Sequence, residues 1–168
     1  MEDVSPARAS IPKTGELPAD AARCGPHRKS PATLDRQENE QAAPSVLVVE
    51  DNSINQRILV AFLRKRGYTV DVANDGAEAV QRMALKRYSL VLMDLQMPVL
   101  DGFEATRLIR SLPELASVPI VAVSAHALND EPRRCLEAGM NGYLAKPVEP
   151  ADLYACVERY AGPPPAAP

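Results

Sequence analysis

The chain has 168 residues, a formal net charge of −3 and 46% hydrophobic residues, which suits one domain with a sizeable core. Between residues 45 and 161, 13 Lys and Arg stand against 15 Asp and Glu with the signs interspersed, so no basic stripe indicates a nucleic-acid partner. No apolar run approaches the roughly 20 residues of a membrane helix. We therefore expect no membrane segment in this chain and a cytoplasmic location.

The two ends of the sequence differ in composition from its middle. Residues 1–44 contain six prolines, no aromatic residue and few large aliphatic residues, which predicts a disordered or linker segment. Residues 162–168 contain only Gly, Pro and Ala, which predicts a flexible tail. The domain is therefore expected over residues 45–161. The three cysteines lack metal-ligand spacing, so we expect reduced thiols, with Cys135 and Cys156 as small hydrophobic residues.

Short apolar runs alternate with amphipathic stretches in the domain, a pattern typical of βαβ units. The runs predict five strands, at residues 46–49, 69–72, 90–93, 120–123 and 143–145. Most of them are too uniformly apolar for one face to lie in water, which favours a parallel sheet buried on both faces. We predict an α/β fold with a five-stranded, doubly wound parallel sheet that has helices on both faces.

Five amphipathic stretches between and after the strands predict helices. The first has an apolar face formed by Ile54, Ile58, Ala61 and Phe62, and Gly67 is expected to end it. The next three are predicted at about residues 77–86, 102–110 and 129–138, and the last begins near residue 150. Aspartates precede the second and third of these helices, at residues 75 and 101, and are interpreted as turn or cap residues without chemistry.

Polar residues with reactive side chains follow four of the five predicted strands. They are Glu50 and Asp51 after the first strand, Asp94 after the third, Ser124 after the fourth and Lys146 after the fifth. The carboxyl ends of parallel strands meet at one edge of the sheet, which is where ligands bind in open α/β sheets. Three carboxylates at one edge repel one another unless a cation or proton neutralises them. Oxygen ligands without His or Cys favour Mg²⁺, or Mn²⁺, over zinc.

Asp94 is the candidate nucleophile at this edge, because a carboxylate can accept a phosphoryl group as an aspartyl phosphate. Lys146 contributes a compact positive charge and Ser124 a hydroxyl donor, and both suit the oxygens of a phosphoryl group. Catalysis would then consist mostly of positioning and charge stabilisation.

Four segments of the sequence resemble the response-regulator receiver domains of two-component phosphorelays, across nearly the whole of residues 45–160. The segments are VVEDN, LMDLQMPVLDG, VAVSAHA and GYLAKP, in the family's order and spacing. Two longer stretches, VVEDNSINQ and SAHALNDEPRRCLEAGMNGYLAKP, resemble more narrowly the receivers of hybrid sensor histidine kinases. Two departures are small: Ser124 stands where threonine is commoner, and Leu100 stands where methionine is frequent.

The resemblance implies a flavodoxin-like strand order, 2-1-3-4-5, and it implies a role for each strand-end residue. Asp94 is expected to accept a phosphoryl group from a phosphohistidine in a Mg²⁺-dependent reaction, and Lys146 to contact that group. Glu50 and Asp51 would hold the ion together with Asp94, and the backbone carbonyl of Gln96 would be a further ligand.

The resemblance also implies a switch that responds to phosphorylation. Ser124 would move toward the phosphoryl group and Tyr143 would follow, and the peptide bond before Pro147 is expected to be cis. His126, two residues beyond Ser124, either lines the mouth of the site or is a solvated loop residue.

The partners that the resemblance implies are a sensor histidine kinase and a histidine phosphotransfer protein. The chain would act as a phosphoacceptor that assists its own phosphorylation and dephosphorylation rather than as an enzyme, and it could form part of a hybrid histidine kinase. A weak homodimer through the fourth helix is left open.

Three alternatives stand beside this interpretation. A haloacid-dehalogenase-type phosphohydrolase also uses a strand-end aspartate and Mg²⁺, but it needs a second aspartate two residues on, where this chain has Gln96. A flavin or nucleotide module needs a phosphate-binding loop after the first strand, where EDNSIN places two acids. A pseudo-receiver would keep the fold as an unphosphorylated interaction module, and the intact acids and lysine argue against it.

Overall fold

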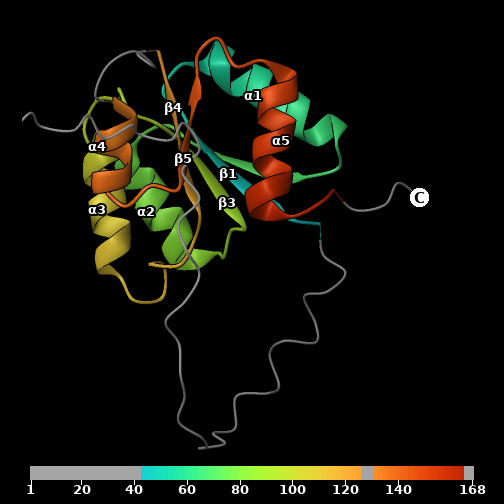
Figure 1. Ribbon diagram of the computed structural model, residues 1–168. Coiled ribbons are helices and arrows are strands. Elements are labelled where there is room, and N and C mark those ends of the chain that lie inside the picture. The colour runs from blue at the N-terminus through green and yellow to red at the C-terminus, as the bar shows by residue number, and fades with distance from the viewer. Residues whose placement is uncertain (1–42, 126–130, 165–168) are drawn as a thin grey trace, which may run out of the picture. The chain divides into compact units, whose positions relative to one another are not determined.

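The computed structural model describes residues 43–125 and 131–164, so most of the predicted linker and the last residues of the predicted tail lie outside that part (Figure 1). The strands are β1 (Ser45–Val49), β2 (Thr69–Ala73), β3 (Leu90–Asp94), β4 (Ile120–Ser124) and β5 (Gly142–Ala145). The helices are α1 (Ser53–Lys65), α2 (Gly76–Leu85), α3 (Gly102–Ser111), α4 (Glu131–Glu137) and α5 (Pro150–Ala161). No helix of the described part has the length and apolar character needed to cross a membrane.

The five strands form one parallel sheet of order β2-β1-β3-β4-β5, which confirms the predicted fold class and strand order. The chain passes from β1 to β2 on one side and then returns to place β3 on the other side of β1. The strand order therefore reverses between β1 and β3. In doubly wound sheets the carboxyl ends of the strands at such a reversal form the binding crevice.

The sheet separates two apolar cores, because successive residues of a strand point to opposite faces. Val48 and Leu92 lie in the core that α1 and α5 cover, whereas Leu47 and Met93 lie in the core that α2, α3 and α4 cover (Figure 1). The three central strands β1, β3 and β4 are buried almost throughout, and the edge strands β2 and β5 are partly exposed. This arrangement fixes which side of the sheet each strand-end side chain faces.

Side-chain caps set the start of three helices. Asn52 accepts hydrogen bonds from two backbone N–H groups in the first turn of α1. Asp75 and Asp101 accept from the N–H of Glu78 and of Glu104 at the starts of α2 and α3, which confirms that both aspartates are caps. Gly67 has a φ of 87° just beyond α1, a conformation that glycine adopts without strain.

The predicted apolar face of α1 is wrong for three of its four residues, and only Phe62 of that face packs against the core under α1 and α5. The buried residues of this helix are Leu59 and Leu63, which pack in the core under α1 and α5. Ile54 and Ile58 are instead 67% and 45% exposed. The helix carries two apolar stripes, and packing against the sheet buries Leu59 and Leu63 while most of the other stripe stays on the surface. The bounds of the remaining elements differ from the predictions by a few residues at most, with the first two residues of the predicted fourth helix outside the described part.

Gly102 allows α3 to approach the end of β3 closely. It is buried, and its N–H donates to the carbonyl oxygen of Leu95. A Cβ atom at this position would collide with the backbone carbonyl oxygen of Asp94. The position of Asp94 therefore depends on the absence of a side chain at residue 102.

We expect Gly102→Ala to lower the free energy of unfolding by about 1–3 kcal/mol, because the added methyl group overpacks a site bounded by backbone. Urea denaturation followed by circular dichroism measures the change. Arg107→Ala, at an exposed position of the same helix, is the control and should stay within about 0.5 kcal/mol of the wild type. Equal stability of the two variants would contradict the prediction.

Candidate functional site

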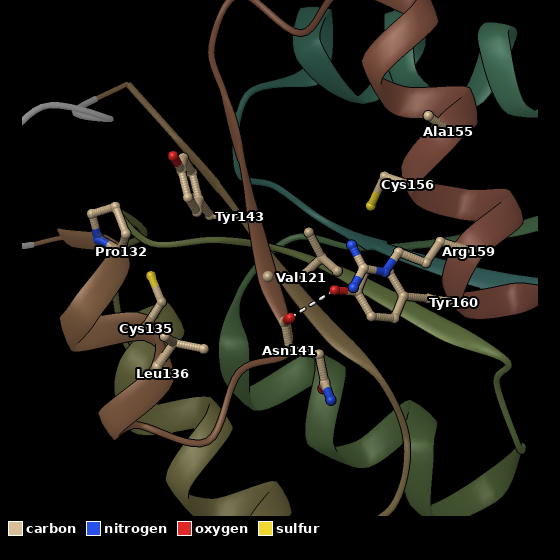
Figure 2. Close-up of a pocket in the computed structure, with 11 residues that line it drawn as sticks. Val121, Pro132, Cys135, Leu136, Asn141, Tyr143, Ala155, Cys156, Arg159 and Tyr160 are labelled. Atoms are coloured by element: carbon tan, nitrogen blue, oxygen red, sulfur yellow. Dashed lines mark hydrogen bonds between the residues drawn. The ribbon is translucent and has the colours of Figure 1, made fainter. Parts of the chain in front are cut away.

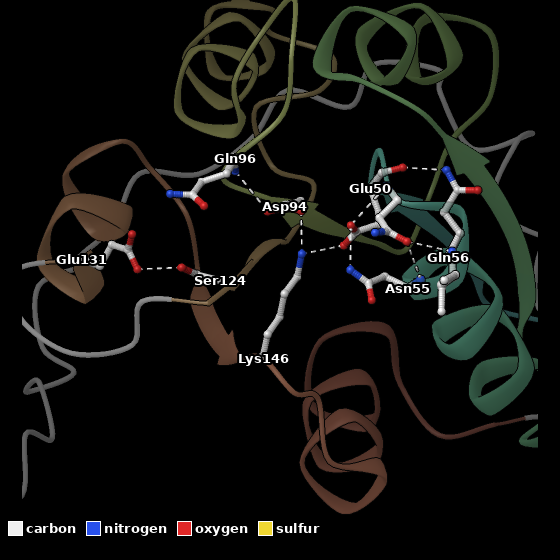
Figure 3. A network of polar contacts seen from close by, with 10 residues as sticks. Glu50, Asn55, Gln56, Asp94, Gln96, Ser124, Glu131 and Lys146 are labelled. Carbon is white, nitrogen blue, oxygen red and sulfur yellow. Dashed lines mark hydrogen bonds and ion pairs between the residues drawn. The ribbon is translucent and has the colours of Figure 1, made fainter.

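The polar residues at the strand ends meet at the carboxyl edge of the sheet (Figure 3). Asp94 is the last residue of β3 and Ser124 the last of β4, while Glu50 and Lys146 directly follow β1 and β5. The parallel registers bring these ends to a common level. The edge lies where the strand order reverses, as the sequence predicted.

Lys146 forms ion pairs with two buried carboxylates. Its Nζ lies 2.7 Å from Oε2 of Glu50 and 2.6 Å from Oδ2 of Asp94. Glu50 and Asp94 are only 1% and 4% exposed. Burial lowers the pKa of Lys146, but hydrogen bonds and attraction from Asp94 and Glu50 raise it, and the net effect is a pKa above the ordinary value. The ammonium therefore stays charged at neutral pH.

Three carboxylates gather in a position to share one cation. One oxygen each from Glu50, Asp51 and Asp94 lies within 4.8 Å of the other two. Asp51 is exposed, so a cation can reach the group from solvent. The donor set is all oxygen and carries more negative charge than Lys146 alone offsets, which fits Mg²⁺ with several retained waters.

Polar residues of α1 hold Glu50 in place. Its Oε1 accepts hydrogen bonds from Nδ2 of Asn55 at 3.0 Å and from the backbone N–H of Asn52 at 3.3 Å. Nε2 of Gln56 donates to the backbone carbonyl of Glu50 at 2.6 Å and to Oδ1 of Asn74 at 3.0 Å (Figure 3). Asn55 and Gln56 are not expected at the site from the sequence, because polar residues in the first turn of a helix ordinarily face solvent.

The second oxygen of Asp94, Oδ1, accepts a hydrogen bond from the backbone N–H of Gln96 at 3.0 Å. The Asp94 carboxylate is thus held from both sides, by this N–H and by the ammonium of Lys146. The peptide bond between Lys146 and Pro147 is cis.

Ser124 and Tyr143 lie in different surroundings. Ser124 is 3% exposed, and its Oγ donates to Oε2 of Glu131 at 2.6 Å. Glu131 is the first residue of α4, and no role is apparent for it from the sequence. Tyr143 is half-exposed on β5. His126 lies outside the described residues.

A cavity of about 460 Å³ lies away from the acidic cluster, between α4, β5 and α5. Figure 2 shows Cys135 of α4 and Cys156 of α5 on its two sides, with Tyr143 beside them. Both thiols are free. Burial raises the pKa of both, that of Cys156 to about 11, so neither is a thiolate at neutral pH.

The comparisons with known proteins agree with this geometry. The model of the response regulator receiver domain matches residues 46–158. The signal transduction histidine-protein kinase BarA of Escherichia coli strain K12 is 37% identical over 144 residues. That match covers 86% of this chain but 16% of BarA, so the chain spans only a small part of such relatives.

Two solved structures resemble the fold closely. The receiver domain of the sensor histidine kinase PA1611 from Pseudomonas aeruginosa PAO1 has a magnesium ion coordinated in its active site cleft. It is 45% identical to this chain, and the match has a TM-score of 0.68 and covers 72% of this chain and 99% of that one. The second structure is the Saccharomyces cerevisiae complex of the histidine phosphotransfer protein Ypd1 with the receiver domain of Ssk1. The match has 38% identity and a TM-score of 0.67, and it covers 70% of this chain and 88% of that one.

These matches do not favour the phosphohydrolase or the unphosphorylated module over a receiver. The matched segment contains Glu50, Asp51, Asp94 and Lys146. It also spans the five strands apart from the first residue of β1, and all of α5 except its last three residues. The chain belongs to the response regulator receiver domain family and contains a receiver domain of phosphorelay systems.

Proposed function

We propose that Asp94 accepts a phosphoryl group from a phosphohistidine. The observation that carries the proposal is the position of its buried carboxylate, 2.6 Å from the Lys146 ammonium and beside Glu50 and Asp51. As the bond between phosphorus and the donor's imidazole nitrogen breaks, a bond forms to a carboxylate oxygen of Asp94. The electron pair of the broken bond stays on the imidazole.

The other residues of the site bind and orient the reacting groups. Glu50, Asp51 and Asp94 would hold Mg²⁺, with Mn²⁺ as a substitute and the backbone carbonyl of Gln96 as a further ligand. When bound, the ion would neutralise charge on the acceptor and phosphoryl oxygens. Lys146 is placed to turn from the two carboxylates toward the phosphoryl oxygens. The same groups would assist attack by water on the acyl phosphate, so the domain contributes to its own phosphorylation and dephosphorylation.

The proposed acceptor can be tested with a small phosphodonor. We expect acetyl phosphate with Mg²⁺ to add one phosphoryl group, about 80 Da from its composition, because phosphoryl transfer here depends mostly on positioning and charge. Intact-mass spectrometry measures the gain. Asp94→Asn and EDTA should each abolish it, whereas Asp101→Asn, which keeps the helix cap, should not. A gain that persists in Asp94→Asn would refute the assignment of the acceptor.

The proposed metal ligands predict a loss of Mg²⁺ affinity in Asp51→Asn. We expect the dissociation constant to rise about tenfold or more, the range that changes around a metal site typically cause. Asp51 is exposed, so the substitution should leave the fold intact. Isothermal titration calorimetry with Mg²⁺ measures the change, and Asp152→Asn, an exposed acid of α5, is the matched control. Unchanged affinity in Asp51→Asn would exclude this residue as a ligand.

We propose that the phosphodonor protein docks beside α1. A groove of about 210 Å³ runs between α1 and the segment after β5, and Ile58, Lys146 and Pro147 line it. The exposed side chains of Ile54 and Ile58 form an apolar stripe next to this groove. A sensor kinase or phosphotransfer protein could therefore bury this stripe while its histidine approaches Asp94. The Ssk1 receiver in complex with Ypd1 supports this class of partner.

The substitution Ile58→Asp tests docking of the donor protein separately from the phosphoryl transfer itself. We expect transfer from phosphorylated Ypd1, used as a surrogate donor, to fall about tenfold, because a charge replaces an apolar contact at the centre of the interface. Phosphorylation by acetyl phosphate should be unchanged. Leu85→Asp, at an exposed apolar position on α2, is the control and should affect neither reaction. An equal loss with both donors, or none with Ypd1, would argue against docking at α1.

Phosphorylation is proposed to act as a switch through Ser124 and Tyr143. The new group adds about two negative charges at the edge of the sheet, and it shifts a two-state equilibrium by its differential contacts with the two states. Ser124 ends β4 and Tyr143 lies on the neighbouring β5, so a movement of the first can reach the second. That the chain forms part of a hybrid kinase in the cytoplasm, and that two copies pair weakly, stay predictions.

A further inference from the structure

The hydroxyl of Ser124 is engaged by α4 rather than by the acceptor. Its Oγ donates to Oε2 of Glu131 at 2.6 Å, the short distance typical of a bond to a carboxylate (Figure 3). Glu131 is half-buried at the first position of α4, where a negative charge is stabilised by the helix dipole. The bond therefore joins the end of β4 to the start of α4.

The alternation of the strands explains why the hydroxyl faces α4. Ser124 shares its side of the sheet with Ala122, which lies in the core under α2, α3 and α4. Asp94 shares the other side with Leu92, which lies in the core under α1 and α5. The two side chains thus start from opposite faces of neighbouring strands, and the hydroxyl must turn to meet a phosphoryl group on Asp94.

We propose that Glu131 is a positioning residue whose carboxylate competes with the phosphoryl group for the Ser124 hydroxyl. A serine hydroxyl has one proton to donate, so a hydrogen bond to the phosphoryl group requires that the bond to Glu131 break. This inference rests on the proposed phosphorylation of Asp94 and adds a residue that opposes the phosphorylated state. The affinity of the site for a phosphoryl group is then lower than the chemistry around Asp94 alone would give.

The competition links phosphorylation to the position of α4. Within this helix only Cys135 is fully buried, and Arg134 lies over the ring of Phe103 at 4.7 Å. Loss of the Ser124 bond would release the first turn of α4, and the phosphoryl charge would repel the Glu131 carboxylate. The cavity between α4, β5 and α5, with Tyr143 in its lining, would change shape as a result (Figure 2).

The test measures the affinity of the 168-residue chain for beryllofluoride, a phosphoryl mimic, in the presence of Mg²⁺. Glu131→Ala removes the competing acceptor, and we expect binding tighter by about fivefold or more, the lower range of coupling between sites. Glu131→Gln removes the same charge but keeps an acceptor oxygen, so its gain should be smaller. The difference between these two variants reports on the hydrogen bond.

One further background and one control variant distinguish a positioning role of Glu131 from a general change in stability or charge. In a Ser124→Ala background, Glu131→Ala and Glu131→Gln should have the same effect, because no hydroxyl is left to release. Glu137→Ala removes a charge from the exposed end of α4, where Glu137 pairs with Arg133 at 3.5 Å, and should leave the affinity unchanged. Circular dichroism checks that each variant is folded.

Tighter binding in Glu131→Ala than in Glu131→Gln, with the difference lost in the Ser124→Ala background, supports the proposal. Equal affinities of wild type and Glu131→Ala, or a difference that persists without the Ser124 hydroxyl, would overturn it while leaving phosphorylation of Asp94 intact. A wild type that neither binds beryllofluoride nor takes a phosphoryl group from acetyl phosphate would overturn the proposed function and this inference with it.

Discussion

The central interaction of the structure is the contact of one ammonium group, that of Lys146, with the buried carboxylates of Glu50 and Asp94. Two carboxylates so close together and so little hydrated repel each other strongly unless a cation lies between them. The lysine meets part of this requirement, and the third carboxylate, from Asp51, leaves an excess of negative charge that favours a divalent cation. The site is therefore already arranged for a charged ligand.

The fold supplies this arrangement without long connections. Because all five strands are parallel, the ends of β1, β3 and β5 lie at one edge, and each contributes a charged group there. The reversal of strand order between β1 and β3 leaves space for a ligand above Glu50 and Asp94. Close packing of Gly102 against the Asp94 carbonyl holds the carboxyl end of β3 from the side of α3.

The gathering of reactive side chains at the strand ends was predictable because it depends on features that are local in the sequence. A buried apolar run followed by an acid or a lysine fixes both the position and the type of group, and the parallel topology brings the groups together. The face that α1 buries was not predictable in this way. Ile54 with Ile58 and Leu59 with Leu63 form two apolar stripes, and only packing against the sheet decides between them.

The missed residues share a different property. Asn55, Gln56 and Glu131 are polar residues near helix starts, where solvent exposure is the usual expectation. Their partners lie at the carboxyl ends of β1, β2 and β4. For Gln96 the resemblance implied a role of the carbonyl oxygen, which stays a prediction, and the additional contact of its N–H with Asp94 was not expected. Such contacts depend on loop geometry that hydrophobic periodicity does not encode.

Identification of the phosphorylated side chain tests the account most directly, because three carboxylates share the site. Borohydride reduction converts an aspartyl phosphate to homoserine, and tandem mass spectrometry of the resulting peptides then locates it. The account predicts homoserine at position 94 after treatment with acetyl phosphate and Mg²⁺, and none there without the metal. A reduced side chain at position 50 or 51 would contradict the account. So would the absence of any reduced side chain in protein that has gained a phosphoryl mass.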